Sequence, residues 1–353
     1  AEEPDTLSLP VVDLAKLYNK HADPEGYAEE CRKVADTFHR FGAILVRDPR
    51  VSDADNNTFQ DMMESYFAIS DGERDARPEH HFQVGVTPSY REKPRDHCDK
   101  MKLLKGKNAS LSKCPPELDP KWRFFWRIGE KPPTTSFGNL NEPPVVPPEI
   151  PEWEDTMNSF GGKLLQAALD VSTMAAEGFG LPAEAFTERM NYAPHLLAPT
   201  ASDLSIHGGL GTVLAGYHKD LNFITCHKAS RFPGLYVWTR DGQKMAVKVP
   251  PETVLMQAGL QFEYLTGGHV LAGFHEVVVQ PATLPVIERR RAEGRSLWRI
   301  SSTLFSHTNS DSILQPLGHF ATPEAMERFP AKPAGQQVLD ELKAIKLSDF
   351  AQE

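Results

Sequence analysis

Beyond about residue 190 the chain consists of short strand-like runs separated by Gly, Pro and Asp-Gly turns. This pattern constrains the fold more than any other feature of the sequence. The runs cover residues 234–239, 245–249, 253–257, 263–265, 275–280 and 297–305. Many short strands bounded by turn residues are typical of antiparallel sheets. We therefore expect an antiparallel barrel or jelly roll in this half of the chain.

The half before residue 190 shows helical periodicity instead. An apolar stripe predicts a helix that ends at Gly42, Ser52 is placed to cap a second helix, and a third is expected over 153–176. Residues 9–13 and 43–46 predict strands. Helices followed by many short strands indicate a mainly β fold with flanking helices and an α-rich N-terminal region.

The charge balance limits the partners of this chain. Its 38 basic and 48 acidic residues give a net charge of −10, so we expect no nucleic acid and no anionic membrane as partner. No apolar stretch approaches the roughly 18 residues that span a bilayer. Residues 1–5 lack the form of a signal peptide, although the missing initiator Met leaves a removed leader open. We expect a cytoplasmic protein.

The four cysteines are scattered along the chain, at Cys31, Cys98, Cys114 and Cys226, with no Cys-x-x-Cys pair. A disulfide framework or a structural zinc site is therefore not expected, and the thiols should be reduced.

His218 and Asp220 are two residues apart, so on a β-strand their side chains project from the same face. A third ligand must come from another strand, and His275 opens such a run. Two imidazoles and one carboxylate are the ligand set of a ferrous ion with open coordination positions. The neighbouring Cys226 and His227 are assigned to core packing rather than to ligation.

A second His-x-Asp pair, His97 and Asp99, shows that the pair alone is weak evidence. It lies among Arg95, Lys100 and Lys102 in the irregular region from about 80 to 150. We interpret this second pair as part of a solvated charged segment.

The run 297–305 alternates cleanly, with Arg299, Ser301 and Thr303 on one face. A guanidinium with a hydroxyl two residues on is suited to binding a carboxylate. A cation facing a barrel interior would be unfavourable unless an anion lies there. The other interpretation is that this polar face points to solvent, and periodicity alone leaves both open.

His-x-Asp at 218–220, a distal His at 275 and Arg-x-Ser-x-x-x-Phe at 299–305 occur in the order typical of one enzyme family. The chain resembles the isopenicillin N synthase-like branch of the iron(II)/2-oxoglutarate-dependent dioxygenases, from about residue 8 to 308. Residues 281–298 form an insertion in this pattern and contain several arginines. Arg289 is therefore an alternative to Arg299 as the anchor of the co-substrate.

The resemblance implies a double-stranded β-helix (jelly-roll) core over residues 151–320. Residues 1–150 would form an N-terminal α/β region, and residues 321–353 a C-terminal helical extension. The insertion is expected to form an exposed helix.

The resemblance also implies roles for individual residues. His218, Asp220 and His275 would bind Fe(II), and Arg299 and Ser301 would hold 2-oxoglutarate. Tyr90 and Arg91, in a loop at the substrate mouth, would contact the substrate.

The implied activity is oxidation of a C–H bond of a small molecule with O2, most simply hydroxylation, with release of succinate and CO2. A monomer is expected. Three alternatives stay open: a 2-oxoglutarate-independent oxidative cyclase or desaturase of the same family, a non-catalytic metal-bound small-molecule-binding protein, and a zinc hydrolase.

Overall fold

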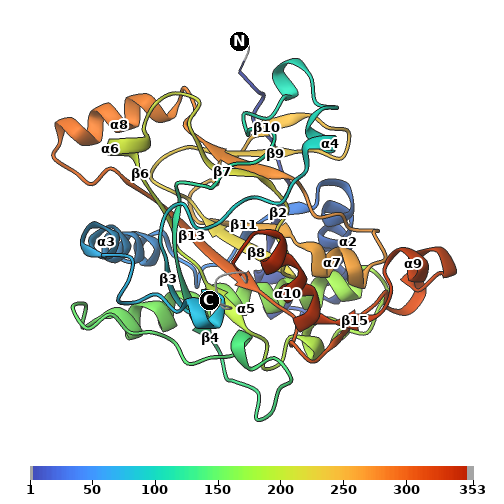
Figure 1. The fold of residues 1–353 in the computed structure, drawn as a ribbon. Helices are drawn as coiled ribbons and strands as arrows, with labels where there is room; N and C mark the ends of the chain where they lie inside the picture. Colours follow the sequence, from blue (N-terminus) through green and yellow to red (C-terminus); the bar gives the residue numbers. More distant parts are fainter. Residues whose placement is uncertain (1–2, 348–353) are drawn as a thin grey trace.

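The computed structural model describes residues 3–347, and its centre is a jelly roll built from the eight strands β6 to β13 (Figure 1). One sheet contains β6, β13, β8 and β11 as neighbours, and the second sheet has the order β10-β9-β12-β7. Consecutive strands therefore alternate between the two sheets, except for the β9–β10 hairpin. The bounds are β6 Thr200–Asp203, β7 Val213–His218, β8 Ile224–Lys228, β9 Leu235–Trp238, β10 Lys244–Ala246, β11 Thr253–Ala258, β12 His275–Val278 and β13 Trp298–Ser306. The predicted jelly-roll core is confirmed.

Five strands that precede β6 in the chain enlarge the first of these sheets to nine strands. β2 pairs with β11, while β4 pairs with both β5 and β6. These added strands are β1 Val11–Asp13, β2 Ala43–Arg47, β3 Gly85–Thr87, β4 Trp122–Ile128 and β5 His195–Leu197. Strands from both sides of residue 150 thus share one sheet, and the domain boundaries at 150 and 320 stay predictions.

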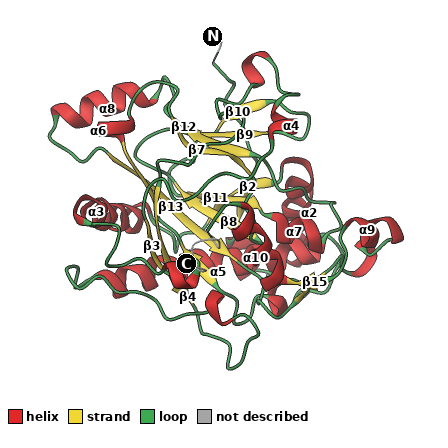
Figure 2. Cartoon of the chain, viewed as in Figure 1, coloured by secondary structure: helices red, strands yellow, loops and turns green. Residues whose placement is uncertain are grey.

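Three long helices cover the outer face of the nine-stranded sheet: α2 Pro24–Phe41, α3 Asp53–Ile69 and α5 Trp153–Gly178. The largest apolar core lies between them and the sheet. Ser52 caps α3, since its hydroxyl accepts a hydrogen bond from Asp55 N at 3.0 Å. Gly42 ends α2 in the left-handed conformation, with φ of 63°. Figure 2 shows the strands in the middle of the molecule with helices around them.

One predicted strand is wrong. Residues 263–265 belong to helix α7, Leu260–Leu265, which buries Gln261, Phe262 and Leu265. A short apolar run does not by itself distinguish a strand from a turn of buried helix. Here the preceding Gly259 turns the chain out of β11, and the run continues as a helix.

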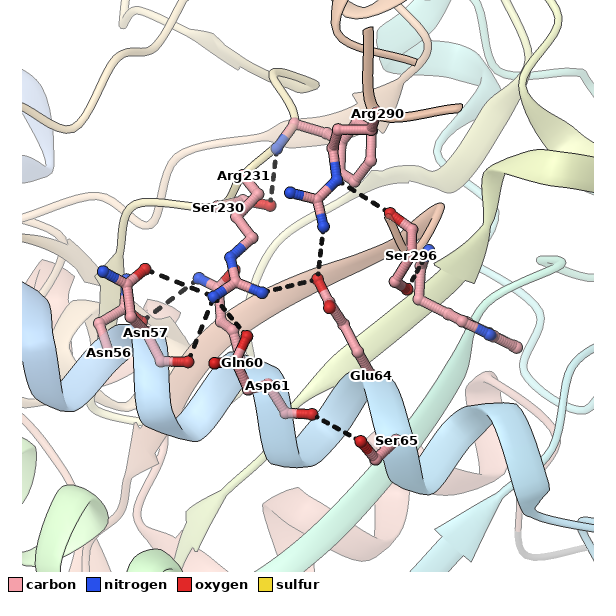
Figure 3. Close-up of polar contacts among 12 residues, drawn as sticks. Asn56, Asn57, Gln60, Asp61, Glu64, Ser65, Ser230, Arg231, Arg290 and Ser296 are labelled. Atoms are coloured by element: carbon pink, nitrogen blue, oxygen red, sulfur yellow. Dashed lines mark hydrogen bonds and ion pairs between the residues drawn. The ribbon is translucent and has the colours of Figure 1, made fainter. Parts of the chain in front are cut away.

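The insertion forms helix α8, Thr283–Ala292, as predicted, but it is not simply exposed. Arg290 is buried, and its guanidinium lies 3.2 Å from Glu64 of α3. Glu64 also pairs with Arg231 at 2.9 Å, and Figure 3 shows this carboxylate between the two guanidinium groups. The insertion is therefore fixed to α3, although it departs from the strand edge.

The expectation of four free thiols is wrong. The structure joins Cys98 to Cys114 by a disulfide, with the two Cα atoms 5.6 Å apart. Cys31 and Cys226 are free and buried. The disulfide closes a local loop in the irregular region, where spacing along the chain does not reveal that the backbone folds back on itself.

The remaining elements are short: α1 Ala15–Tyr18, α4 Cys98–Met101, α6 Leu204–His207, α9 Pro323–Arg328, α10 Ala334–Ala344, β14 Ile313–Leu314 and β15 Lys332–Pro333. Helices α9 and α10 lie in the predicted C-terminal extension. Across residues 3–347, no helix has the length and apolar character needed to cross a membrane.

Candidate active site

The structure brings His218, Asp220 and His275 together at one end of the four-stranded sheet. His275 opens β12 directly opposite His218, the last residue of β7. Oδ1 of Asp220 lies 3.6 Å from Nε2 of His218 and 3.4 Å from Nε2 of His275. One ligand atom from each residue lies within 4.8 Å of the other two. Within residues 3–347 this is the one cluster of His, Cys, Asp or Glu side chains that fits a metal ion.

The remaining polar atoms of these side chains are held by the protein. Nδ1 of His218 donates to Gly216 O at 2.6 Å, and Nδ1 of His275 contacts Gly273 O at 3.4 Å. These contacts favour the tautomer in which Nε2 carries the free lone pair. The hydroxyl of Thr225 donates to Oδ2 of Asp220 at 2.7 Å. Such partners orient metal ligands and fix their tautomers.

The electrostatics of the cluster favour the metal-binding protonation states of Asp220 and His218, whereas His275 is shifted toward its protonated form. Burial and the neighbouring His275 lower the pKa of His218 to about 4. Burial acts to raise the pKa of Asp220, but the two histidines outweigh it and hold that pKa well below its usual value. The pKa of His275 is raised, because the attraction of Asp220 outweighs its burial. Asp220 is therefore a carboxylate and His218 a neutral imidazole.

The second His-x-Asp pair does not form a comparable site. Asp99 is fully exposed and pairs with Lys102 at 3.3 Å. His97 packs edge-on against Phe274 at 4.9 Å between ring centroids. Asp99 is solvated as predicted, whereas His97 is partly buried.

Arg299 and Ser301 lie on β13 and face the interior, so the solvent-facing interpretation of this strand is wrong. Only 7% of Arg299 is exposed, and its Nη1 donates to Ser301 Oγ at 3.0 Å. Within residues 3–347 Arg299 has no carboxylate partner, and its buried Nε has no hydrogen-bond partner. Gly234 makes room for it, because a Cβ there would lie 2.9 Å from Nε. By contrast, Arg289 on α8 is exposed.

A cavity of about 520 Å³ extends from the metal cluster to Arg299. The inward side chains of β13 line it in sequence: Arg299, Ser301, Thr303 and Phe305. His227, which pairs across the sheet with Thr303, also lines it and leaves its buried Nε2 without a partner. The sequence interpretation of His227 as core packing is therefore wrong, whereas Cys226 is buried against α5. Side chains alternate along a strand, so His227 faces the same side of β8 as Thr225. This alternation could have predicted the inward position of His227.

A second cavity of about 620 Å³ adjoins the first. His218, Asp220, Lys121, Arg123 and Phe305 line both cavities, so the metal cluster lies where they meet. Arg123 was not among the site residues expected from the sequence.

His307 follows β13 and lines the second cavity, two residues beyond Phe305. Burial lowers its pKa to about 3, and its Nδ1 has no hydrogen-bond partner within the described residues. The alternation of β13 thus continues from the first cavity into the second.

The structure places Tyr90 and Arg91 close to the second cavity but outside its lining. Both are exposed, and the lining begins at the next residue, Glu92, and continues to His97. Tyr90 has a positive φ of 59° and its amide donates to Asp119 O at 2.8 Å. Their role as substrate contacts stays a prediction.

Comparisons with known proteins agree with this geometry. No family model matches the chain. The 2-oxoglutarate-dependent dioxygenase phqC of Penicillium fellutanum is 27% identical over 183 residues, covering 50% of each protein. A 2-oxoglutarate-dependent dioxygenase of Gibberella zeae is 24% identical over 200 residues, covering 51% of this chain and 49% of the relative. The chain therefore matches about half the length of these curated relatives.

Solved structures match over nearly the whole chain. A 2OG-Fe(II) oxygenase family protein of Caulobacter crescentus has a TM-score of 0.73 at 21% identity, covering 96% of this chain and 100% of its own. A full-length Neurospora crassa protein, solved in complex with alpha-KG, also has a TM-score of 0.73 at 19% identity, covering 98% and 99%. The fold is the jelly roll of the 2OG-Fe(II) oxygenases. The resemblance to 2-oxoglutarate-dependent dioxygenases is confirmed, but these matches do not distinguish the isopenicillin N synthase-like branch.

Proposed function

We propose that the protein is a non-haem Fe(II)- and 2-oxoglutarate-dependent dioxygenase that hydroxylates a C–H bond of a small molecule. Substrate, 2-oxoglutarate and O2 would yield the alcohol, succinate and CO2. His218, Asp220 and His275 would hold the iron, and Arg299 with Ser301 would hold the distal carboxylate of 2-oxoglutarate.

The observation that carries this proposal is the buried guanidinium of Arg299, which has no carboxylate partner within residues 3–347 and lies in the cavity that also contains the metal cluster. A buried charge without a partner is costly, and a bidentate carboxylate would satisfy it. The orphaned Nε and the neighbouring Ser301 hydroxyl fit a bound carboxylate. Burial lowers the pKa of Arg299 to about 10, so the group stays charged at neutral pH.

The cluster itself fits ferrous iron. Two imidazoles and one carboxylate leave up to three positions of an octahedral ion for other ligands. Bound iron(II), together with 2-oxoglutarate and O2, supplies the oxidation of the C–H bond. The protein supplies the orientation of the three ligand atoms through Gly216, Gly273 and Thr225, and it encloses the reacting groups between the two cavities.

Anaerobic addition of Fe(II) and 2-oxoglutarate tests the proposal. The wild-type protein should develop a weak visible charge-transfer band, and the His218→Ala variant should not. Admission of O2 should then release succinate and CO2. A wild-type protein without the band, or a band that persists in His218→Ala, would contradict the assignment.

The same assay separates the alternatives. An oxidative cyclase that does without 2-oxoglutarate would show no band that depends on 2-oxoglutarate, and neither would a zinc hydrolase or a non-catalytic binder. The monomeric state and the cytoplasmic location stay predictions.

A further inference from the structure

The two buried arginines near the metal cluster differ in one respect. Arg299 lacks a carboxylate partner in the described chain, whereas Arg123 forms an ion pair with Glu92. Only 12% of the Arg123 side chain and 6% of the Glu92 side chain are exposed. Arg299 thus lines only the first cavity and has no carboxylate partner in the described chain, whereas Arg123 lines both cavities and is compensated by Glu92.

Lys121 and Asp119 complete a group that we call the buried quartet: Glu92, Asp119, Lys121 and Arg123. Nζ of Lys121 lies 2.9 Å from Glu92 and 3.2 Å from Asp119. Asp119 is fixed further by Gly216 N, which donates to it at 3.0 Å. Two carboxylates and two cations therefore meet on the wall of the second cavity, and each has a partner of opposite charge.

Besides the quartet and the metal ligand Asp220, the charged side chains of this lining are those of Lys93, Arg95, Asp96, Lys100, Lys219 and Glu341. Asp96 is exposed and Lys93 is partly exposed. Arg95 pairs with Glu341, and Lys219 pairs with Glu263 at 3.2 Å. Lys100 is exposed. These groups are solvated or already paired, so they contribute little to the binding of a single charged ligand deep in the cavity.

We propose that the second cavity takes an uncharged substrate that presents an amide-like group, with adjacent N–H and C=O, to the buried quartet. This inference rests on the proposed function. A carboxylate would lie against Glu92, and an ammonium against Arg123 and Lys121, so either would add an uncompensated buried charge. An amide has one donor for Glu92 and one acceptor for Arg123, whose buried Nε has no hydrogen-bond partner in the described chain.

The rest of the lining suits an apolar or aromatic remainder. Phe125, Phe274, Phe305, Leu196 and Leu221 contribute side chains to this cavity. Phe125 also lies under the Arg123 guanidinium, which is 4.3 Å from the centre of the ring. The substrate class is therefore a mostly apolar molecule with an uncharged lactam, imide or carboxamide.

Three probes of matched shape test the inference: biphenyl-4-carboxamide, biphenyl-4-carboxylate and biphenyl-4-ylmethylammonium. Their dissociation constants would be measured anaerobically by calorimetry on protein saturated with Fe(II) and 2-oxoglutarate. In the wild type the carboxamide should bind at least about tenfold more tightly than either charged probe. An equal or tighter charged probe, or no carboxamide binding at millimolar concentration, would overturn the inference.

Variants of the quartet should move the preference in opposite directions. Glu92→Gln leaves an excess cation and should favour the carboxylate, whereas Arg123→Gln leaves an excess anion and should favour the ammonium. Lys100→Gln, at an exposed residue of the same lining, should leave the order unchanged. Two quartet variants that move the preference in the same direction would also overturn the inference. If either variant fails to fold, the wild-type order still decides the question.

The visible band separates this inference from the proposed function. It would be measured on the same samples before the probes are added. A missing band contradicts the dioxygenase assignment itself, while a normal band with the wrong probe order contradicts only the substrate class.

Discussion

Nε2 of His275 lies 3.4 Å from Oδ1 of Asp220, because His275 and His218 are paired across the β12–β7 ladder. The antiparallel register, and not proximity along the chain, places the distal histidine beside the His-x-Asp pair. The site therefore depends on the correct pairing of two strands of the smaller sheet.

Replacement of His275 by Ala should weaken Fe(II) binding by more than about 100-fold and abolish the visible band, because one of three ligand atoms is lost. Asp99→Ala is the matched control, since Asp99 belongs to the other His-x-Asp pair and is fully exposed. Metal titration of both variants checks the prediction. A weakened site in Asp99→Ala would show that the wrong pair has been chosen.

Thr225→Val should weaken Fe(II) binding by about 10- to 100-fold without unfolding the protein. The change keeps the shape of the side chain but removes the hydroxyl that donates to Asp220 at 2.7 Å. The carboxylate then loses the contact that fixes its orientation. Thr173→Val, which removes a hydroxyl bonded to a helix carbonyl of α5, is the control. Unchanged metal affinity in Thr225→Val would refute the positioning role.

The jelly roll, and the grouping of Arg299 with the metal cluster, could be predicted from the sequence for a physical reason. Alternation along a strand fixes which side chains share a face, and the order of motifs follows the order of strands. His218 and His275 lie at strand ends and Arg299 on a strand face. Asp220 was expected on the same strand as His218, but it lies in the loop two residues beyond the end of β7.

The parts that could not be predicted lie where distant segments meet without a periodic pattern. Glu92 and Asp119 come from irregular chain around β3 and β4, and their partners become apparent only in three dimensions. The Cys98–Cys114 disulfide lies in the same irregular region. His227 is different, since its inward position follows from the alternation of β8.

Arg299→Gln should weaken 2-oxoglutarate binding by about 2–5 kcal/mol, because the buried cation that faces the distal carboxylate is lost. Arg289→Gln, on the exposed face of α8, should have no effect. Gly234→Ala should weaken 2-oxoglutarate binding in part, since the added Cβ would press on the Arg299 guanidinium. Titration of the visible band measures all three. A loss confined to Arg289→Gln would identify the alternative anchor.

The Cys98–Cys114 disulfide should be found by mass spectrometry of peptides prepared without reductant, with Cys31 and Cys226 free. The bridge closes a loop with a sequence separation of 16, so its reduction should lower the free energy of unfolding by about 3 kcal/mol. Denaturant titration with and without reductant measures this. The double variant Cys98→Ser/Cys114→Ser should not respond to reductant. Four titratable thiols in the unreduced, unfolded chain would contradict the bridge.

Both ring nitrogens of the buried His195 form hydrogen bonds, and together these bonds require the neutral imidazole. Its Nε2 donates to Met190 O at 3.0 Å, and its Nδ1 accepts from His307 N at 3.0 Å. A proton on Nδ1 would face another donor. Burial lowers the pKa of His195 to about 4, below the 6.5 of an ordinary histidine.

The folded-state pKa of His195 is thus below the unfolded value, so its contribution to stability is complete above pH 6.5 and falls as the pH drops toward 4. Between pH 7 and pH 5 the His195 imidazole becomes protonated in the unfolded state but stays neutral in the folded state. The free energy of unfolding of the wild type should therefore fall by about 2 kcal/mol over this pH range because of His195. Denaturant titrations at both pH values should show a loss about 2 kcal/mol smaller in His195→Gln. His21→Gln, at an exposed histidine, should keep the wild-type loss. Equal losses of unfolding free energy in the wild type and in His195→Gln would contradict a lowered pKa of His195 in the folded protein.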